Sequence, residues 1–242
     1  MRELSLFTGA GGGILGTHHL LGHTPVGYVE WDGYCQRVLA ARMADGLLPI
    51  APIFGDVREF VRSGAAAEYR GIADLVSAGF PCQPFSEAGE RRGESDARNM
   101  WPATLDAIRA VRPSRVLLEN VPGIIFCGYA GVVLLGLSGL GYVGRYGIIR
   151  ASETGAFHHR ARWWVVAHAK GSSQLHQSKR NKYAAKRMSY NSSAWREDRS
   201  FATTASRLCR VADGIPNRVD ATSACGNAQV PRVVRAAWEL LR

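Results

Sequence analysis

Short apolar segments recur along the first 170 residues, at intervals that leave room for a helix between them. They lie at residues 3–7, 26–31, 52–57, 73–80, 115–121 and 162–169. Several lack a polar alternation, which is typical of strands buried on both faces of a sheet. Helices are predicted between them, for example at Tyr34–Met43 and Ala103–Val111. Strands that alternate with helices predict an α/β domain with a doubly wound, mostly parallel sheet.

The strand and helix pattern stops after Ala169. The segment from Lys170 to Ser206 is rich in Ser, Lys, Asn, Gln and Arg, and it has too few large aliphatic residues to build a core alone. Helical spacing returns at the end of the chain, at Val233, Val234, Ala237, Trp238 and Leu241. We therefore divide the chain into an α/β domain (1–169), a short separate segment (170–210) and a C-terminal segment that returns to the domain (211–242).

Composition places the chain among globular proteins. Of its 242 residues 46% are apolar and 21% are charged, which excludes disordered, collagen-like and coiled-coil classes. The net charge of +10 is uneven, since residues 1–170 hold 17 basic and 15 acidic residues and residues 171–242 hold 13 and 5. Aromatic residues interleave with the basic ones, at Tyr183, Tyr190, Trp195 and Phe201. This mixture suits a polyanion with stackable bases, and a solvated polar loop has the same composition.

The sequence shows no sign of export, membrane insertion or metal binding. No apolar run approaches the roughly 20 residues of a membrane span, and the N-terminus lacks the features of a secretory signal, so we expect a cytoplasmic protein. The five cysteines are widely spaced and form no C-x-x-C pair, so neither a disulfide framework nor a metal site is predicted. They are Cys35, Cys82, Cys127, Cys209 and Cys225.

A glycine-rich turn, LFTGAGGGILG (6–16), follows the first predicted strand and opens a helix. Such a turn lets a ligand approach the backbone at a helix N-terminus, although a simple tight turn uses the same glycines. The next strand ends in Glu30 and Trp31, an acid that can bind ribose hydroxyls beside an aromatic ring. The third ends in Asp56, which can accept a hydrogen bond from an adenine amine or cap a helix. Together these strand ends suggest a nucleoside-containing cofactor.

Two further strands end in groups that can do chemistry. The strand at 73–80 runs into a loop with Cys82 in the sequence GFPCQPFS, and the strand at 115–121 ends in Glu119 and Asn120. Ligands bind at the carboxyl ends of strands in doubly wound sheets, so a thiol and a carboxylate are expected at one edge. The structural alternatives are a small core residue for Cys82 and helix capping for Glu119 or Asn120.

These blocks resemble, in order, those of the cytosine carbon-5 DNA methyltransferases. The matching segments are FTGAGGG, Glu30-Trp31, Asp56, GFPCQPFS, Glu119-Asn120-Val121, HHRAR (158–162) and GNAQVP (226–231). The resemblance covers residues 3–169 and 207–242, and its cysteine and glutamate blocks are the most specific. It implies a Rossmann-like methyltransferase fold in which residues 1–169 form the catalytic domain. It also implies S-adenosylmethionine as methyl donor and a target-recognition segment at 170–210.

The resemblance assigns catalytic roles to four residues. Cys82 would add as a thiolate to carbon 6 of cytosine, which makes carbon 5 nucleophilic. Glu119 would bind ring nitrogen 3 and the exocyclic amine, and Arg160 and Arg162 match paired arginines that contact the base and the catalytic loop. The base must leave the duplex for this reaction, and the charged stretch Gln83–Asn99 either closes over it or is merely solvated.

The same resemblance implies a donor site and shows some departures from the family pattern. The donor-binding positions are Phe7, Gly9, Gly11, Glu30, Trp31, Asp56, Pro81 and Asn227. Ser5 stands where the family often has Asp, His158 replaces a Gln, and Phe157 replaces a Pro. The recognition segment, of about 40 residues, is far shorter than is usual in the family.

The resemblance therefore implies an enzyme that methylates carbon 5 of cytosine within a short sequence of double-stranded DNA. We expect a cytoplasmic monomer, associated with the nucleoid through DNA. Three roles stay open for it, namely a restriction–modification partner with a cognate endonuclease at the same site, a phage enzyme and a stand-alone methylase. An alternative is cytosine methylation in transfer RNA, although the Cys-Phe-Thr tripeptide of that type is absent. A second is an inactive DNA-binding or donor-sensing relative, and a third is a nicotinamide dehydrogenase, which rests on the glycine turn alone.

Overall fold

The computed structural model describes residues 1–81, 99–171 and 218–242. In these residues one seven-stranded sheet has the order β3-β2-β1-β4-β5-β7-β6. Its strands are β1 (Arg2–Leu6), β2 (Thr24–Val29), β3 (Ile53–Phe54), β4 (Leu75–Ala78), β5 (Arg115–Asn120), β6 (Tyr142–Arg150) and β7 (Ala161–Ala169). The five strands from β3 to β5 are parallel, whereas β7 runs antiparallel to both β5 and β6. The predicted mostly parallel sheet is confirmed.

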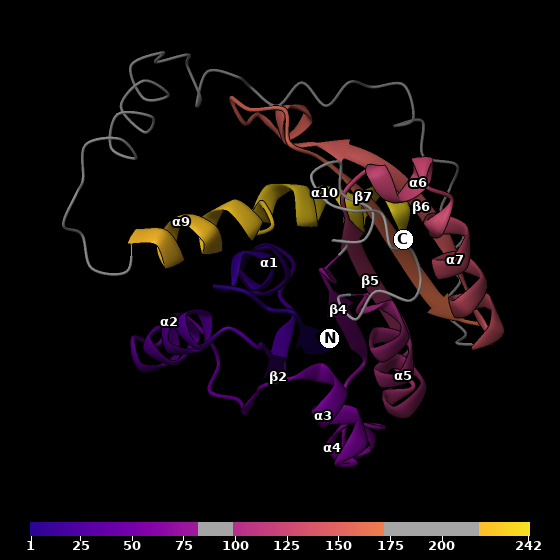
Figure 1. Ribbon diagram of the computed structural model, residues 1–242, viewed down its shortest axis with the longest axis horizontal. Helices are drawn as coiled ribbons and strands as arrows, with labels where there is room; N and C mark the ends of the chain where they lie inside the picture. Colours follow the sequence, from indigo (N-terminus) through magenta and orange to yellow (C-terminus); the bar gives the residue numbers. More distant parts are fainter. Residues whose placement is uncertain (82–98, 172–217) are drawn as a thin grey trace.

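Helices cover both faces of this sheet (Figure 1). They are α1 (Gly12–Ile14), α2 (Gly33–Ala44), α3 (Val57–Arg62), α4 (Ala65–Glu68), α5 (Trp101–Val111), α6 (Gly123–Phe126), α7 (Tyr129–Gly139), α9 (Arg218–Asn227) and α10 (Pro231–Leu241). A π-helical turn, η1 (Leu15–Leu20), continues α1, and a 3-10 turn, η4 (Ala151–Thr154), precedes β7. Helices α3, α5 and α7 pack on one face and α1, α2 and α10 on the other, so the predicted doubly wound arrangement is confirmed.

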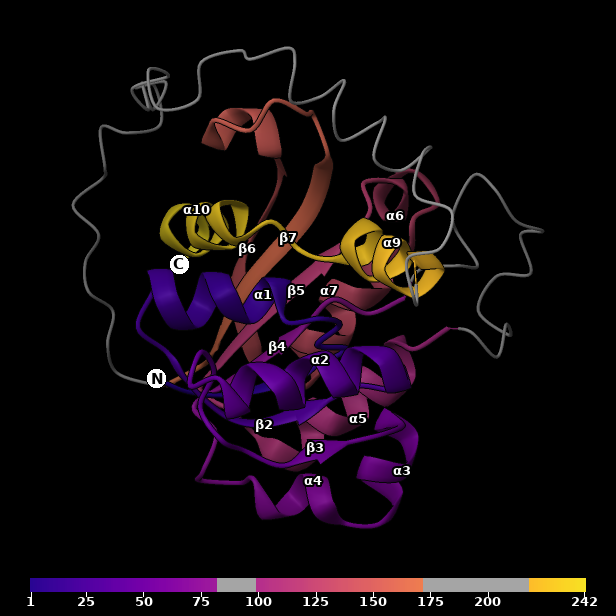
Figure 2. The ribbon, with the colours of Figure 1, turned by 90° about the vertical axis from the view of Figure 1, so that its left-hand side faces the viewer.

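Alternate side chains of the central strands pack into the hydrophobic cores on the two faces of the sheet. On β7, Trp163 packs in the core under α5 and α7, and its neighbour Trp164 packs in the core under α10. Both side chains are almost fully buried, which explains why this strand is apolar without alternation. The helix predicted at the end of the chain is α10, and it buries Val234 and Trp238 against the sheet (Figure 2).

Strand β6 and helix α7 are two of the elements that the sequence prediction did not name. Strand β6 lies at the edge of the sheet, and most of its residues are exposed, so it has no continuous apolar run. Helix α7 is apolar almost throughout and shows little periodicity, because Leu135 is exposed on one side while Val133 and Leu137 are buried on the other. The formation of both elements depends more on packing against neighbouring elements than on their own pattern of apolar and polar residues.

Part of the predicted organisation lies outside the described residues. This applies to the recognition segment 170–210 beyond Gly171, and to the loop Gln83–Asn99 up to Arg98. The division of the chain at 169 and 210 therefore stays a prediction. Within the described ranges, no helix is both long enough and apolar enough to cross a membrane.

The packing of α10 predicts a large loss of stability for Trp238→Ala. Trp238 is only 5% exposed and its ring meets that of His23 edge-on, with centroids 5.1 Å apart. Removing a buried aromatic side chain leaves a cavity and costs about 3–5 kcal/mol of unfolding free energy. Leu240→Ala is the control, because Leu240 on the same helix is half-exposed and its loss should cost less than about 1 kcal/mol. Urea unfolding that gives equal losses for both variants would contradict the docking of α10.

Candidate active site

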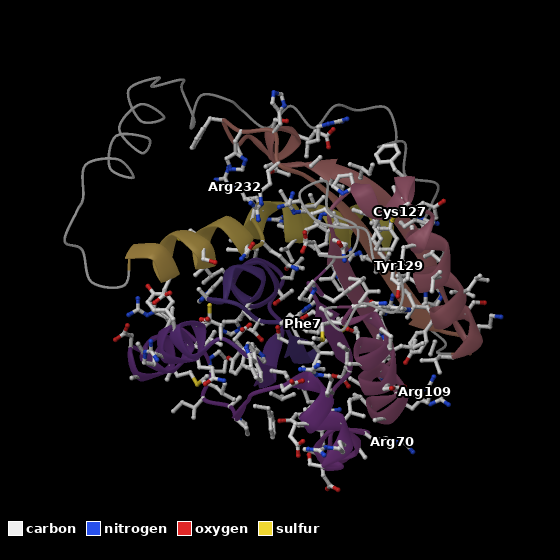
Figure 3. The ribbon with its side chains drawn as sticks, viewed as in Figure 1. Phe7, Arg70, Arg109, Cys127, Tyr129 and Arg232 are labelled. Carbon is white, nitrogen blue, oxygen red and sulfur yellow. The ribbon has the colours of Figure 1, made fainter. Side chains whose placement is uncertain are left out.

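A cavity of about 780 Å³ opens where β1, β2, β4 and β5 end. Nine of the twelve predicted site residues line it, namely Phe7, Gly9, Glu30, Trp31, Asp56, Pro81, Glu119, Arg162 and Asn227. Gly11 and Arg160 are not among the residues that line it, and Cys82 lies outside the described residues. The side chains come together at the carboxyl ends of strands, as expected for a doubly wound sheet. Figure 3 places Phe7 near the centre of the molecule.

The glycine-rich turn has a strained, left-handed backbone. Phe7, Gly9 and Gly11 have φ angles of 55°, 58° and 90°, a region that glycine adopts without steric cost. The amide of Gly9 donates a hydrogen bond of 2.6 Å to Glu30 Oε2, which joins the turn to the end of β2. Gly11 packs closely against α2, because a Cβ at Gly11 would lie 3.3 Å from Leu39 Cδ2. Positive φ at Phe7, a non-glycine residue, is the kind of strain that gathers at functional sites.

Glu30 and Trp31 form one wall of the cavity. The Glu30 carboxylate accepts hydrogen bonds from the amides of Gly9 and, at 2.8 Å, Asp32. These contacts fix its orientation and leave lone pairs for further donors such as hydroxyl groups. The Trp31 side chain is 74% exposed, so its ring is available for stacking at the mouth of the cavity.

Asp56 caps a helix and lines the cavity. Its carboxylate caps α3 by accepting from the Arg58 amide at 2.7 Å, and it pairs with the Arg58 guanidinium at 2.5 Å. The hydrogen bonds from Arg58 lower the pKa of Asp56, so it is charged at neutral pH. Because Asp56 also lines the cavity, this negative charge faces any ligand there.

Glu119 is a buried carboxyl group held by two donors. Arg162 Nε lies 2.9 Å from its Oε1, and Gln229 Nε2 donates to its Oε2 at 3.3 Å. Burial raises the pKa of Glu119, while Arg162, Gln229 and Arg160 act in the opposite direction. The net upward shift makes Glu119 easier to protonate than an exposed glutamate. Such a group can donate a proton to a hydrogen bond as well as accept one.

Asn120 joins the ends of two strands. Its Nδ2 donates to the carbonyl of Phe80 at 3.0 Å, and its Oδ1 accepts from the Val121 amide. The following helix, α6, begins after Pro122 and has no side-chain cap, so neither Glu119 nor Asn120 is a capping residue. This contact holds the end of β4 beside Glu119. Pro81, the last described residue before Cys82, lines the same cavity.

The two arginines expected to act together have different contacts. Arg162 pairs with Glu119, as described above. Arg160 instead donates to the carbonyls of Gly226 and Ala228, both at 2.7 Å, and so holds the loop between α9 and α10. Burial, together with the charge of Arg162, lowers the pKa of Arg160. This guanidinium is engaged with the backbone, which favours a positioning role.

Several cavity residues were missed from the sequence. Asp220 and Ser223 line the cavity with Asn227, and their spacing of three and four residues along α9 was a usable signal. Gln229 belongs to the quoted GNAQVP block but was given no role. Nothing in the sequence marked Glu3 as a cavity residue, because a glutamate in a strand is expected to be exposed to solvent. It is fully buried, and Ser77 Oγ donates to its Oε1 at 2.5 Å.

The cavity is acidic although the chain is basic. Its lining includes six acids, Glu3, Glu30, Asp32, Asp56, Glu119 and Asp220, against the two bases Arg58 and Arg162. Burial raises the pKa of Glu3 and of Glu119, which reduces but does not reverse this excess. An acidic lining attracts cationic ligands and repels a pyrophosphate. Within the described residues no group of three or more His, Cys, Asp or Glu side chains is arranged to hold a metal ion.

Solved structures share this fold. A mutant of DNMT2 from Spodoptera frugiperda aligns with a TM-score of 0.58 and 17% identity, over 72% of this chain and 51% of that one. A DNA modification methyltransferase encoded within an E. coli prophage, described as putative, aligns with a TM-score of 0.54 and 23% identity, over 70% and 47%. At such identities the likeness establishes the architecture, which confirms the predicted Rossmann-like methyltransferase fold.

Sequence comparisons identify the family. The model of the C-5 cytosine-specific DNA methylase matches residues 1–210. Type II methyltransferase M.NgoMIV of Neisseria gonorrhoeae is 32% identical over 168 residues, 68% of this chain and 51% of that protein. Type II methyltransferase M.CviJI of Paramecium bursaria Chlorella virus IL3A is 33% identical over 168 residues, 69% and 42%. The chain thus spans about half the length of these relatives. By the extent of the family match, the chain belongs to the C-5 cytosine-specific DNA methylases.

Proposed function

We propose that the protein transfers a methyl group from S-adenosylmethionine to carbon 5 of cytosine in double-stranded DNA. The observation that carries this proposal is the position of Glu119. It is a buried carboxyl group at the end of β5, paired with Arg162, in the same cavity as Pro81 and the glycine turn. A carboxyl group that can hold a proton, placed next to the entry of the Cys82 loop, is what addition of a thiolate to a pyrimidine ring needs.

The cavity suits the methyl donor by its charge and by the side chains that line it. S-adenosylmethionine, when bound, supplies a methyl group carried on a positively charged sulfur. Six acidic side chains line the cavity, which suits a cation better than a dinucleotide with two phosphates. Glu30 would hold the ribose hydroxyls and Trp31 would stack on the adenine, and the other predicted donor-binding residues on the lining are Phe7, Gly9, Asp56, Pro81 and Asn227.

Glu119 would bind the edge of the cytosine ring. Ring nitrogen 3 is a hydrogen-bond acceptor, so Glu119 must donate a proton to it, and the raised pKa of this buried group favours the protonated form. The second carboxyl oxygen can accept from the exocyclic amine. When a thiolate adds to carbon 6, negative charge develops on the ring, and the hydrogen bond to nitrogen 3 stabilises it. Arg162 keeps the carboxyl group oriented.

Cys82 would be the nucleophile of this reaction. Its thiolate forms a bond to carbon 6, which makes carbon 5 electron-rich enough to take the methyl group. Loss of the carbon-5 proton and breakage of the carbon–sulfur bond then return the thiolate and release 5-methylcytosine. The cavity can receive the base only outside the stacked duplex, so the cytosine must be flipped. Arg160 would support the site through the loop at 226–228 that it holds.

The relatives suggest the wider role. The two proteins compared above are Type II methyltransferases. By that likeness we infer a short target sequence and a restriction endonuclease that acts on the same site. The basic segment 170–210 would supply the contacts to DNA, because it holds ten lysines and arginines and only two acids.

Replacing Cys82 tests the nucleophile. Cys82→Ser should lower methylation by at least about a thousandfold, since a serine hydroxyl is far less nucleophilic than a thiolate. A duplex with 5-fluorocytosine at the target should trap a covalent adduct with the wild type and none with this variant, as seen on a denaturing gel. Bisulfite sequencing of DNA from expressing cells identifies the target. Cys127→Ser is the control, because Cys127 is exposed and away from the cavity. Methylation retained by Cys82→Ser would disprove the assignment.

Replacing Trp31 tests the donor site. Loss of the stacking ring in Trp31→Ala should weaken binding of S-adenosylmethionine by about 1–3 kcal/mol, which is about 5- to 150-fold in Kd. Titration calorimetry should show no binding of NAD to the wild type. Phe126→Ala is the control, because Phe126 is as exposed as Trp31 but does not line the cavity. Tight NAD binding, with no response to the methyl donor, would favour the dehydrogenase interpretation instead.

Replacing basic residues of the segment 170–210 tests the DNA contacts. Each lost phosphate contact flattens the salt dependence of binding by about 0.9 in log–log slope. A variant with alanine at five positions should therefore bind all duplexes more weakly and lose up to about 4.5 units of log–log slope. These positions are Lys179, Arg180, Lys182, Lys186 and Arg187. A variant with alanine at Arg62 and Arg70 is the control, because both are exposed arginines of the first 169 residues, outside the tested segment. Equal slopes for all three proteins would place DNA binding elsewhere.

A further inference from the structure

Gln229 connects the C-terminal loop to the buried carboxyl group of Glu119. It lies between α9 and α10, and its Nε2 donates to Glu119 Oε2 at 3.3 Å across 110 residues of sequence. The other oxygen of Glu119 is taken by Arg162 Nε at 2.9 Å. The two oxygens are therefore held by donors of different kinds, a cation from β7 and a neutral amide from the loop.

The side-chain amide of Gln229 is closely packed between two glycines, Gly79 and Gly13. A Cβ on Gly79, at the end of β4, would lie 2.7 Å from Gln229 Nε2. A Cβ on Gly13, in the glycine-rich turn, would lie 2.5 Å from Gln229 Oε1. Both distances are shorter than real side chains tolerate, so each end of the amide is packed against a glycine. Gln229 thus spans the space between the donor-binding turn and Glu119.

The backbone that carries Gln229 is fixed on both sides. Arg160 holds the carbonyls of Gly226 and Ala228, the residue directly before Gln229. Directly after it, Val230 is the N-cap of α10, which is anchored in the core by Trp238. A side chain on such a rigid loop can impose its own position on its partner.

We propose that Gln229 is a positioning residue that fixes Glu119 toward the cytosine ring without adding a further positive charge. The proposal rests on the function proposed above. Arg162 and Arg160 are the charged side chains of the described residues that act on Glu119, and both stabilise its negative form. A third cation at position 229 would hold Glu119 charged and prevent it from donating to ring nitrogen 3. A neutral amide gives the same orientation and leaves the proton available.

Two variants of similar shape separate this role from simple space filling. Gln229→Met keeps the length of the side chain and removes the donor, and Gln229→Glu replaces the amide with a second acid. Leu240→Met, on the half-exposed side of α10, is the matched control. The full chain of each variant is labelled with carbon-13 at the glutamate carboxyl groups, and the Glu119 signal is followed by NMR across pH. The signal is assigned by its loss in Glu119→Gln. Methyl transfer to DNA and the KM for the donor are measured in parallel.

In Gln229→Met the titration midpoint of Glu119 should move to higher pH, because a hydrogen bond to its charged form is lost. The rate of methyl transfer should fall by about ten- to a hundredfold with an unchanged donor KM, since the carboxyl group is less well placed. In Gln229→Glu the midpoint should also rise, because two acids share one site. If Gln229→Met folds poorly, this second variant provides the test.

A wild-type midpoint and rate in Gln229→Met would overturn the proposal and reduce Gln229 to a space-filling residue. The same holds if Gln229→Glu leaves the Glu119 midpoint in place. If the wild type itself does not methylate cytosine in DNA, the proposed function fails. The titration does not depend on activity, so it still decides whether Gln229 holds Glu119.

Discussion

The burial of the Glu119 carboxyl group is the constraint on which the site depends. A carboxylate taken out of water is costly unless donors replace the lost solvent, and Arg162 and Gln229 are those donors. Each of them needs support in turn. Gln229 requires the loop held by Arg160, and it requires glycine at positions 13 and 79 to make space. The donor turn, the end of β4 and the C-terminal loop are therefore arranged around one carboxyl group.

The direction of β7 explains how an arginine reaches that carboxyl group. Because β7 runs antiparallel to β5, its first residues lie at the end of the sheet where the parallel strands finish. The pairing of Asn120 with Trp163 and of Glu119 with Trp164 places Arg162 beside the carboxyl end of β5. A parallel strand in the same place would begin at the opposite end of the sheet, where the other parallel strands begin. The antiparallel pair at the edge of the sheet is thus part of the site.

Much of the fold and part of the site could be predicted from the sequence. The parallel strands are largely apolar, and Glu30, Asp56 and Glu119 lie at or just after the ends of three of them, so position along a strand was enough to group them. Gln229 and Glu3 could not be found in this way. Gln229 acts through a contact that forms only when the chain returns to the sheet, and Glu3 is polar in an interior position. Cys82 lies outside the described residues, so its role stays a proposal.

The distribution of charge reconciles two ligands of opposite sign. A cationic methyl donor favours acidic surroundings, whereas DNA favours basic ones, and a single uniform field would repel one of them. In this chain six acids line the cavity, five of them from the first 169 residues, and the basic excess belongs to residues 171–242. Salt screens charges over about 8 Å at physiological ionic strength, so charges farther apart than this hardly affect each other's ligands. The acidic lining and the basic excess thus belong mostly to different parts of the sequence, in a chain whose net charge is +10.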